Sequence, residues 1–353
     1  MGTLVAFLVI SFLVFFHEAG HFLAAKFFGV KVEVFSIGFG KKLLIKNYKG
    51  TQYCFSMIPL GGYVQMKGQD DSNPTLRNFD NDSYNTKSPW QRIMILFAGP
   101  FANFLLAFLL YIIIALNGVS FLAPIVGGVT PDSPAFIAGF QQNDKVVMIN
   151  QQEISTWNDL SKIIQKTNEP LTFKIERNNA IHTIHVTPKL YEAKTIFGEV
   201  IQKPMIGISS SKNTVLRHFS PLEAISYAYE ETLSASLLIV QSLQKFIQGV
   251  VSPKELGGII SIVKVTSDAS EVGIIALFYL TALISVNLGV LNLLPIPALD
   301  GGHILLNIYE VIARKSPSEK VLYGITVVGW IFLLSLTAFT IFNDIYRLTG
   351  GYQ

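Results

Sequence analysis

The chain has 353 residues and a formal net charge of +3; 50% of its residues are hydrophobic and only 14% are charged. A soluble domain carries about 25% charged residues, so this composition excludes an ordinary soluble protein and indicates an integral membrane protein. The small net charge gives no support for a nucleic-acid partner, and the single cysteine, Cys54, excludes an intrachain disulfide.

Four stretches predict membrane-spanning helices, because each approaches the roughly 20 apolar residues that a span needs. They lie at Leu4–Ala25, Ile93–Leu116, Ile274–Pro295 and Leu322–Phe342. Lysines and arginines gather between the first two spans and between the last two, and connections rich in these residues face the cytoplasm. The large segment 120–270 is therefore expected on the opposite side of the membrane.

The first span contains the motif HEAGH at residues 17–21. Positions i and i+4 lie on one face of a helix, so His17 and His21 can bind one Zn²⁺, while Glu18 points to one side and can take a proton from a water molecule. A titratable group in mid-bilayer costs about 2.5–3.5 kcal/mol, and a metal is a natural compensating partner. Histidines that merely pack between helices, beside a buried glutamate, are the alternative.

The segment after the first span predicts a β-hairpin followed by a polar loop. Residues Phe55–Met66 contain Gly61-Gly62 between two apolar arms, which suits a tight turn. The aspartates of the following loop lack the spacing of an EF-hand, so we expect a solvated cytoplasmic loop rather than a calcium site. These aspartates are Asp70, Asp71, Asp80 and Asp82.

Residues 119–192 predict a soluble α/β domain. Ser155-Thr156 can cap a helix, and Asn178-Asn179 can form the turn of a hairpin. The run from Ser133 to Leu160 resembles a PDZ domain, a fold that binds extended peptides by adding a strand to a sheet edge. A small α/β module without peptide affinity is the alternative. The expected elements are Lys145–Asn150, Trp157–Gln165, Leu171–Arg177 and Ile181–Thr187.

Residues 193–270 predict a linker followed by a surface helix. The helix candidate, Leu222–Val250, is interrupted by three glutamates and by Lys245, so an amphipathic helix on the membrane or on the protein is favoured. A fifth span is the alternative, and it would reverse the side of everything that follows.

A catalytic zinc site needs a third protein ligand, because such sites use three ligands and leave one position for water. The segment Asn292–His303 contains two prolines that break the third span, and broken helices at membrane depth often mark binding sites. We favour Asp300 as the third ligand because a His₂-carboxylate set suits hydrolysis. His303 is the competing candidate.

HEAGH in the first span, combined with NLLPIPALDGGH at Asn292–His303, resembles the site-2 protease family of intramembrane zinc metalloproteases. Further matches are similar to its bacterial regulator-of-sigma-E protease branch, and the resemblance covers nearly the whole chain. One departure is the single PDZ-like domain, where the best-known enterobacterial form has two in tandem. These further matches are Gly99-Pro100, Asn103, Phe55–Gly68 and Lys254–Ile262.

The fold that this resemblance implies is a polytopic α-helical membrane protein of about four transmembrane helices. A re-entrant β-hairpin and one α/β PDZ-like soluble domain complete it. The expected domains are 1–118 (two spans and a cytoplasmic-side β-loop), 119–192 (PDZ-like), 193–270 (linker and amphipathic helix) and 271–353 (two spans).

The activity that the resemblance implies is a zinc endopeptidase that cuts peptide bonds within transmembrane segments. Its partners are the lipid bilayer and single-span proteins already trimmed by another protease, such as anti-sigma factors or remnant signal peptides. Its location is the bacterial inner membrane, with the PDZ-like domain on the periplasmic side and the active site toward the cytoplasm. The implied residues are Glu18 (catalytic), His17, His21 and Asp300 (zinc), and Asn292, Gly61, Gly62 and Tyr63 (substrate).

Two other classes of protein remain open from the residues alone. Intramembrane histidine and acidic groups also line ion paths, and broken helices are typical of transporters, but no inverted repeat or relay of charges is present. A catalytically silent scaffold that binds peptides through the PDZ-like module would not need Glu18, whereas hydrolysis does.

Overall fold

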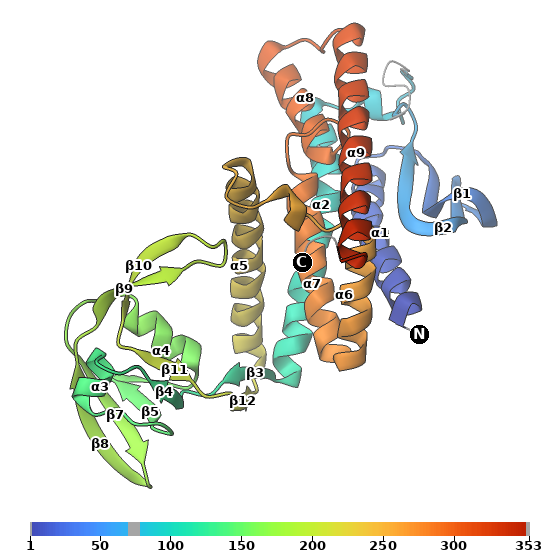
Figure 1. Cartoon of the computed structure of the whole chain (residues 1–353). Helices are drawn as coiled ribbons and strands as arrows, with labels where there is room; N and C mark the ends of the chain where they lie inside the picture. The colour runs from blue at the N-terminus through green and yellow to red at the C-terminus, as the bar shows by residue number, and fades with distance from the viewer. Residues whose placement is uncertain (1, 70–77, 351–353) are drawn as a thin grey trace. The chain divides into compact units, whose positions relative to one another are not determined.

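The computed structural model describes residues 2–69 and 78–350, and it divides into two units. One unit comprises Met1–Ile114, Ala224–Phe246 and Ser252–Gln353, and the other comprises Ala115–Glu223 and Ile247–Val251. The boundaries fall near the ends of two long helices, α2 and α5 (Figure 1).

The first unit is built mainly from long helices (Figure 1). Short 3₁₀ turns at Tyr84–Thr86 and Pro253–Glu255 precede two of them. The helices are α1 (Gly2–Phe27), α2 (Pro89–Asn117), α5 (Pro221–Ile247), α6 (Ile259–Val272), α7 (Ile274–Asn292), α8 (Asp300–Ala313) and α9 (Glu319–Leu348).

Four helices within the described ranges are long and apolar enough to cross a membrane: α1, α2, α7 and α9. They coincide with the four predicted spans, and α5 is not among them. Only 6% of the most apolar window of α9 and 11% of that of α1 is buried inside the protein. Apolar surface on this scale needs lipid to cover it, so the chain is a multi-pass membrane protein.

The third span ends earlier than the sequence analysis predicted. α7 stops at Asn292 rather than Pro295, because proline has no N–H for the helical ladder and disfavours helical geometry in the residue before it. Asp300 therefore does not belong to α7 but begins a separate helix, α8, which the sequence analysis did not predict.

The predicted hairpin turn at Gly61-Gly62 was wrong. The turn joins strands β1 (Val32–Tyr48) and β2 (Thr51–Met66) at Lys49-Gly50, where φ is 47° and 77°. Positive φ at both central residues is what a two-residue hairpin turn requires. Gly62 lies inside β2, where a Cβ atom would approach the Ser36 carbonyl oxygen to 2.7 Å. The glycine signal at 61–62 thus reflects close packing of backbone.

The β1–β2 sheet folds back on itself, so that one part of β1 has two neighbours. Residues 34–37 pair with residues 62–65 on one side and with residues 52–55 on the other. Residues 44–48 also pair with 51–55. Among the pairings of described residues, the end of β2 has partners on one side only, and it therefore forms an edge of the sheet.

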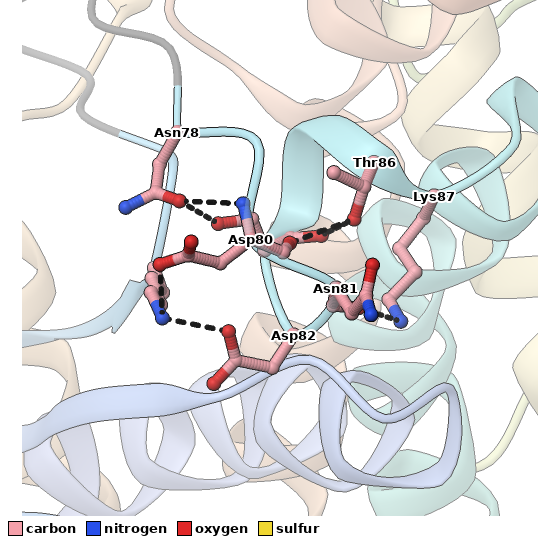
Figure 2. A network of polar contacts seen from close by, with 8 residues as sticks. Asn78, Asp80, Asn81, Asp82, Thr86 and Lys87 are labelled. Atoms are coloured by element: carbon pink, nitrogen blue, oxygen red, sulfur yellow. Dashed lines mark hydrogen bonds and ion pairs between the residues drawn. The ribbon is translucent and has the colours of Figure 1, made fainter.

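A network of ion pairs lies just beyond the end of β2 (Figure 2). Lys67 Nζ lies 2.8 Å from Asp80 Oδ2 and 2.7 Å from Asp82 Oδ1. The hydrogen bonds to these carboxylates raise the pKa of Lys67, and the bond from Lys67 lowers the pKa of Asp82. The predicted solvated aspartates here are thus partly paired, whereas Asp70 and Asp71 lie outside the described residues.

The second unit has a four-stranded sheet in the order β6-β5-β7-β8, with a core that includes Val146, Leu160 and Phe173. Three two-stranded pairs complete it: β3 with β12, β4 with β11, and β9 with β10. Its elements are β3 (Val119–Leu122), β4 (Val126–Val129), α3 (Pro134–Ala138), β5 (Lys145–Ile149), β6 (Gln152–Glu153), α4 (Trp157–Ile164), β7 (Leu171–Arg177), β8 (Ala180–Val186), β9 (Lys189–Lys194), β10 (Val200–Met205), β11 (Ile208–Ser210) and β12 (Thr214–Arg217).

The predicted local signals in this unit are confirmed. Thr156 caps α4 in a capping box with Asp159, which satisfies two otherwise unpaired backbone N–H groups. Asn178 and Asn179 have φ of 49° and 62° and join β7 to β8.

The segment 193–270, expected as a linker followed by a surface helix, contains the strands β10, β11 and β12 before α5. β11 and β12 return to pair with β4 and β3, at the beginning of the same unit. The strands of the second unit therefore continue well past residue 192, the expected end of the PDZ-like domain. These short strands carry a weak alternating pattern, and their partners lie far away in the sequence, so local periodicity does not reveal them.

Candidate metal centre

Three side chains of the first unit, two from α1 and one from the start of α8, converge on one another. His17 Nε2 lies 3.2 Å from His21 Nε2 and 3.2 Å from Asp300 Oδ2, and His21 Nε2 lies 3.4 Å from the same oxygen. Together these atoms form a nearly equilateral triangle. In the described ranges they are the group of histidine, cysteine and acidic residues whose ligand atoms lie closely enough to share a metal ion.

The spacing of the triangle fits zinc. Zinc–ligand bonds of about 2.0–2.1 Å in a tetrahedron place neighbouring ligand atoms about 3.3–3.4 Å apart, and the three measured separations are 3.2–3.4 Å. In addition, Asp300 Oδ2 is buried without a hydrogen-bond partner in the part of the chain that the structure describes. A buried carboxylate oxygen left in this state needs a cation, so the donor set and the orphaned atom both fit Zn²⁺.

The two histidines meet because α1 is helical throughout the motif. Residues 17 and 21 lie on one face of α1, and that face is closely packed against α2: a Cβ atom at Gly20 would lie 2.2 Å from the Ala98 carbonyl oxygen. A Cβ atom at Gly99 would lie 2.2 Å from His21 Nε2. Both glycines are therefore required for the imidazoles to occupy the space between α1 and α2.

Asp300 reaches the histidines because the chain bends tightly between α7 and α8. Cβ atoms at Gly301 and Gly302 would lie 2.3 Å and 2.4 Å from the carbonyl oxygens of Leu294 and Ile296. The two glycines thus let the start of α8 pack directly on the proline-containing turn. Asp300 is in the first turn of α8, where the N-terminal helix dipole stabilises a carboxylate.

The competing ligand, His303, lies one turn further along α8. It lines the same cavity as Asp300, but it does not belong to the group of ligand atoms around His17 and His21. In this geometry Asp300 is the third ligand candidate and His303 is a neighbour of the centre.

The metal-ligand candidates open into a cavity of about 270 Å³. Glu18 lines this cavity, and a Cβ atom at Gly62 would lie 3.4 Å from Glu18 Cγ, so the edge of β2 approaches the candidate base closely. Asn292 and Tyr63 line the cavity as well. Gly61, in contrast, packs on Phe39, whose ring a Cβ atom would approach to 2.1 Å.

A second layer of contacts surrounds the histidines, and the sequence analysis did not predict it. His21 Nδ1 lies 2.9 Å from the Ile95 carbonyl oxygen, and His17 Nδ1 lies 3.1 Å from the Asn103 side-chain amide. The carbonyl contact has no sequence signal. For Asn103 a signal was present, because an amide in the middle of an apolar span needs a polar partner.

Comparison with known proteins gives a consistent result over the full length. Residues 5–336 match Peptidase family M50. The protein named "Putative zinc metalloprotease Cj1068" of Campylobacter jejuni is 48% identical over 343 residues, which cover 97% of this chain and 93% of that protein. The protein named "Putative zinc metalloprotease" of Helicobacter pylori (strain J99) is 42% identical over 355 residues, which cover 98% of this chain and 99% of that protein.

A solved PDZ domain of the SdrC-like protein from Listeria monocytogenes also matches, with 17% identity over 26% of this chain and 90% of that domain. Its TM-score is 0.21. This overlap is too low to assign a fold, and the PDZ-like character of the second unit stays a prediction.

Proposed function

The chain belongs to Peptidase family M50, the site-2 protease family, and from this premise we propose that it is a zinc-dependent endopeptidase that cleaves peptide bonds within transmembrane segments. The observation that carries the proposal is the triangle of His17, His21 and Asp300, with Glu18 in the same cavity. In the proposed centre, His17 Nε2, His21 Nε2 and Asp300 Oδ2 hold the metal.

Each residue of the centre has a distinct chemical task. A zinc ion bound by these three residues would supply a Lewis acid for the scissile carbonyl and would lower the pKa of a water molecule to near 7. Glu18 takes the proton of the attacking water and passes it to the leaving amine. The two neutral imidazoles and one carboxylate leave a net positive centre, and the Glu18 carboxylate balances it within an apolar bundle.

The edge of β2 supplies a place for an unwound substrate. A transmembrane helix hides its peptide bonds in its own hydrogen bonds, so cleavage requires local unwinding, and an extended peptide can then add to an open sheet edge. Residues 62–66 pair with β1 on one side, and Gly62 and Tyr63 line the cavity with Glu18. Asn292, which lines the same cavity, can donate its amide to the substrate backbone.

The proposed setting is the cytoplasmic membrane of a bacterium, with the PDZ-like unit outside the cytoplasm and the metal centre toward the cytoplasmic side. The basic residues between α1 and α2 support this orientation. The proposed substrates are single-span membrane proteins that another protease has already trimmed, such as anti-sigma factors or remnant signal peptides.

The test is a cleavage assay with purified protein in detergent and a single-span substrate. We expect Glu18→Gln to keep a full complement of zinc and to lose at least ~100-fold in the rate of cleavage, because loss of a general base costs about 10²–10⁴-fold. Elemental analysis measures the zinc, and gel analysis of the products measures the cleavage.

The matched variants are Asp300→Ala and His303→Ala. We expect the first to lose zinc and the second to retain it, since only Asp300 joins the ligand triangle. The proposal would be contradicted if the Glu18→Gln variant cleaved the substrate at the wild-type rate, or if the Asp300→Ala variant retained its zinc.

A further inference from the structure

Asn103 of α2 is a fully buried amide in contact with one of the candidate ligands. Its exposed fraction is 0%, and its side-chain amide lies 3.1 Å from His17 Nδ1. Its other amide atom, Oδ1, is buried without a hydrogen-bond partner among the residues that the structure describes. The main-chain oxygen of Asn103 accepts a separate hydrogen bond from Ser285 Oγ at 2.7 Å.

This arrangement is hard to explain as packing alone. A buried amide atom without a partner destabilises the folded protein, so an asparagine kept only to join helices would have both amide atoms paired. The link from α2 to α7 is made by the Asn103 main chain and Ser285, and it does not require the side chain. Within residues 2–69 and 78–350, the partner of the amide is the ring of His17.

The chemistry of the imidazole decides which amide atom must face it. His17 Nε2 is the atom that points into the triangle, so a neutral ring that binds a metal there keeps its proton on Nδ1. That proton needs an acceptor. With the amide nitrogen toward Nδ1, the ring proton would sit on Nε2 and exclude the metal. Turning the amide by 180° preserves its shape and presents Oδ1 instead.

His21 shows the same requirement met in another way. Its Nδ1 lies 2.9 Å from the Ile95 carbonyl oxygen, an atom that can only accept a hydrogen bond. The proton of the neutral His21 ring is therefore held on Nδ1, and Nε2 keeps its lone pair for a metal. Both histidines are thus oriented from α2, one by the main chain and one by a side chain that a substitution can change.

We propose that Asn103 is a positioning residue that accepts the Nδ1 proton of His17 and thereby fixes the ring form and direction in which His17 binds the metal. The inference rests on the proposed zinc centre and adds a residue to it. Hydrogen-bond partners of this kind contribute about 10–100-fold to metal affinity. Asn103 contacts His17 and is not among the residues that line the cavity with Glu18, so its effect appears first in metal binding.

The experiment measures zinc affinity of the purified full-length protein by competition with a chromophoric chelator. We expect Asn103→Leu to weaken zinc binding by about 10–100-fold. Asn103→Asp keeps an acceptor of the same shape and should bind zinc within about threefold of wild type. Ser285→Ala, which removes the main-chain link but leaves the amide, should bind zinc as wild type does.

Two further readouts separate positioning from a loss of folding. The thermal unfolding of the metal-free proteins should be similar for wild type and Asn103→Leu, and Co²⁺-loaded Asn103→Leu should show a changed visible spectrum that Asn103→Asp restores. The inference about Asn103 would be overturned, with the proposed centre left standing, if Asn103→Leu bound zinc as tightly as wild type. The same follows if Asn103→Asp bound zinc as weakly as Asn103→Leu. Failure of the wild-type protein to bind zinc would overturn the proposed centre and this inference with it.

Discussion

Gly99 is the residue on which the position of His21 depends most directly. It faces α1 at the level of the motif, and the nearest atom to a Cβ at this position is His21 Nε2, at 2.2 Å. Real Cβ atoms essentially never approach a neighbour within 3.0 Å, and the imidazole is held from the other side by the Ile95 carbonyl oxygen. The residue between the helices must therefore be glycine if the ring is to point at Asp300.

At this scale we predict that Gly99→Ala displaces the His21 ring. Overpacking of this kind costs about 1–3 kcal/mol, and the displaced Nε2 can no longer complete the ligand triangle, so zinc affinity should fall by more than about tenfold. Chelator competition and thermal unfolding measure the two effects.

The matched control is Gly324→Ala in α9, where a Cβ atom would meet nothing within 4 Å. It introduces the same methyl group into a spanning helix and should leave zinc affinity unchanged. Normal zinc binding by Gly99→Ala would show that the helices can separate at no cost to the centre.

At the scale of elements, the end of α9 holds the start of α6. Asp344 is buried, with 2% exposure, and its carboxylate accepts hydrogen bonds from the backbone N–H groups of Gly258, Ile260 and Ser261 at 3.0–3.1 Å. These N–H groups belong to the N-cap residue Gly258 and the first turn of α6, and they have no partner within the helix. The side chain of one helix thus caps another helix that is distant in sequence.

The cap matters because α6 packs on the helix that carries the metal-ligand motif. A Cβ atom at Gly2 of α1 would lie 1.9 Å from Ser267 Oγ of α6. Asn343, beside Asp344, donates its amide to the Pro253 carbonyl oxygen at 2.9 Å, and Arg347 donates to the Lys254 carbonyl oxygen at 2.8 Å. Three polar residues of α9 therefore fix the segment that leads into α6.

We predict that Asp344→Ala loosens α6 without changing the metal ligands. Removal of the carboxylate leaves several buried N–H groups unpaired, which costs about 2–3 kcal/mol, so amide hydrogen exchange of residues 258–266 should become faster. Mass spectrometry of peptides from the detergent-solubilised protein measures this exchange.

Asp268→Ala, which removes an exposed carboxylate from α6 itself, is the control and should leave the exchange of these amides unaltered. Unchanged exchange in Asp344→Ala would mean that packing on α1 alone holds α6 in place.

At the scale of the whole molecule, the candidate metal centre belongs to one of the two units alone. All of the candidate ligands, Glu18 and the cavity residues belong to the first unit. The second unit is an insertion whose ends lie side by side, because β3 and β12 are antiparallel neighbours and Leu122 pairs with Thr214. An insertion of this kind can be removed at one point, without drawing distant chain ends together.

We predict that removal of residues 123–213, with Leu122 joined to Thr214 by an Asn-Gly turn, leaves zinc binding intact. We expect the soluble unit to screen substrates by bulk, so the shortened protein should cleave a precursor with a long external domain about tenfold or more faster than the full chain does. Parallel assays with a long and a trimmed form of one substrate measure the change.

The trimmed substrate serves as the control, because its cleavage should be equally fast with either protein. If the shortened protein still discriminated between the two precursors as the full chain does, the unit would have another role.

The sequence by itself determined the features that depend on neighbouring residues. The positions of the four apolar spans, the common face of His17 and His21, the cap of α4 and the Asn178-Asn179 turn all follow from a local period or a local hydrogen bond. These features were predicted correctly because no distant residue is needed to form them.

Only the tertiary structure decided the features that join distant parts of the chain. The proximity of Asp300 rather than His303 to the histidines, the return of β11 and β12 to the start of their unit, and the contact of Asn103 with His17 each join residues at least 79 positions apart. The misplaced hairpin turn has the same origin, because Gly61-Gly62 shows the turn composition but serves close packing against β1 and α1. The type of a side chain does not reveal which distant part of the chain the side chain will contact, since that depends on how whole elements pack.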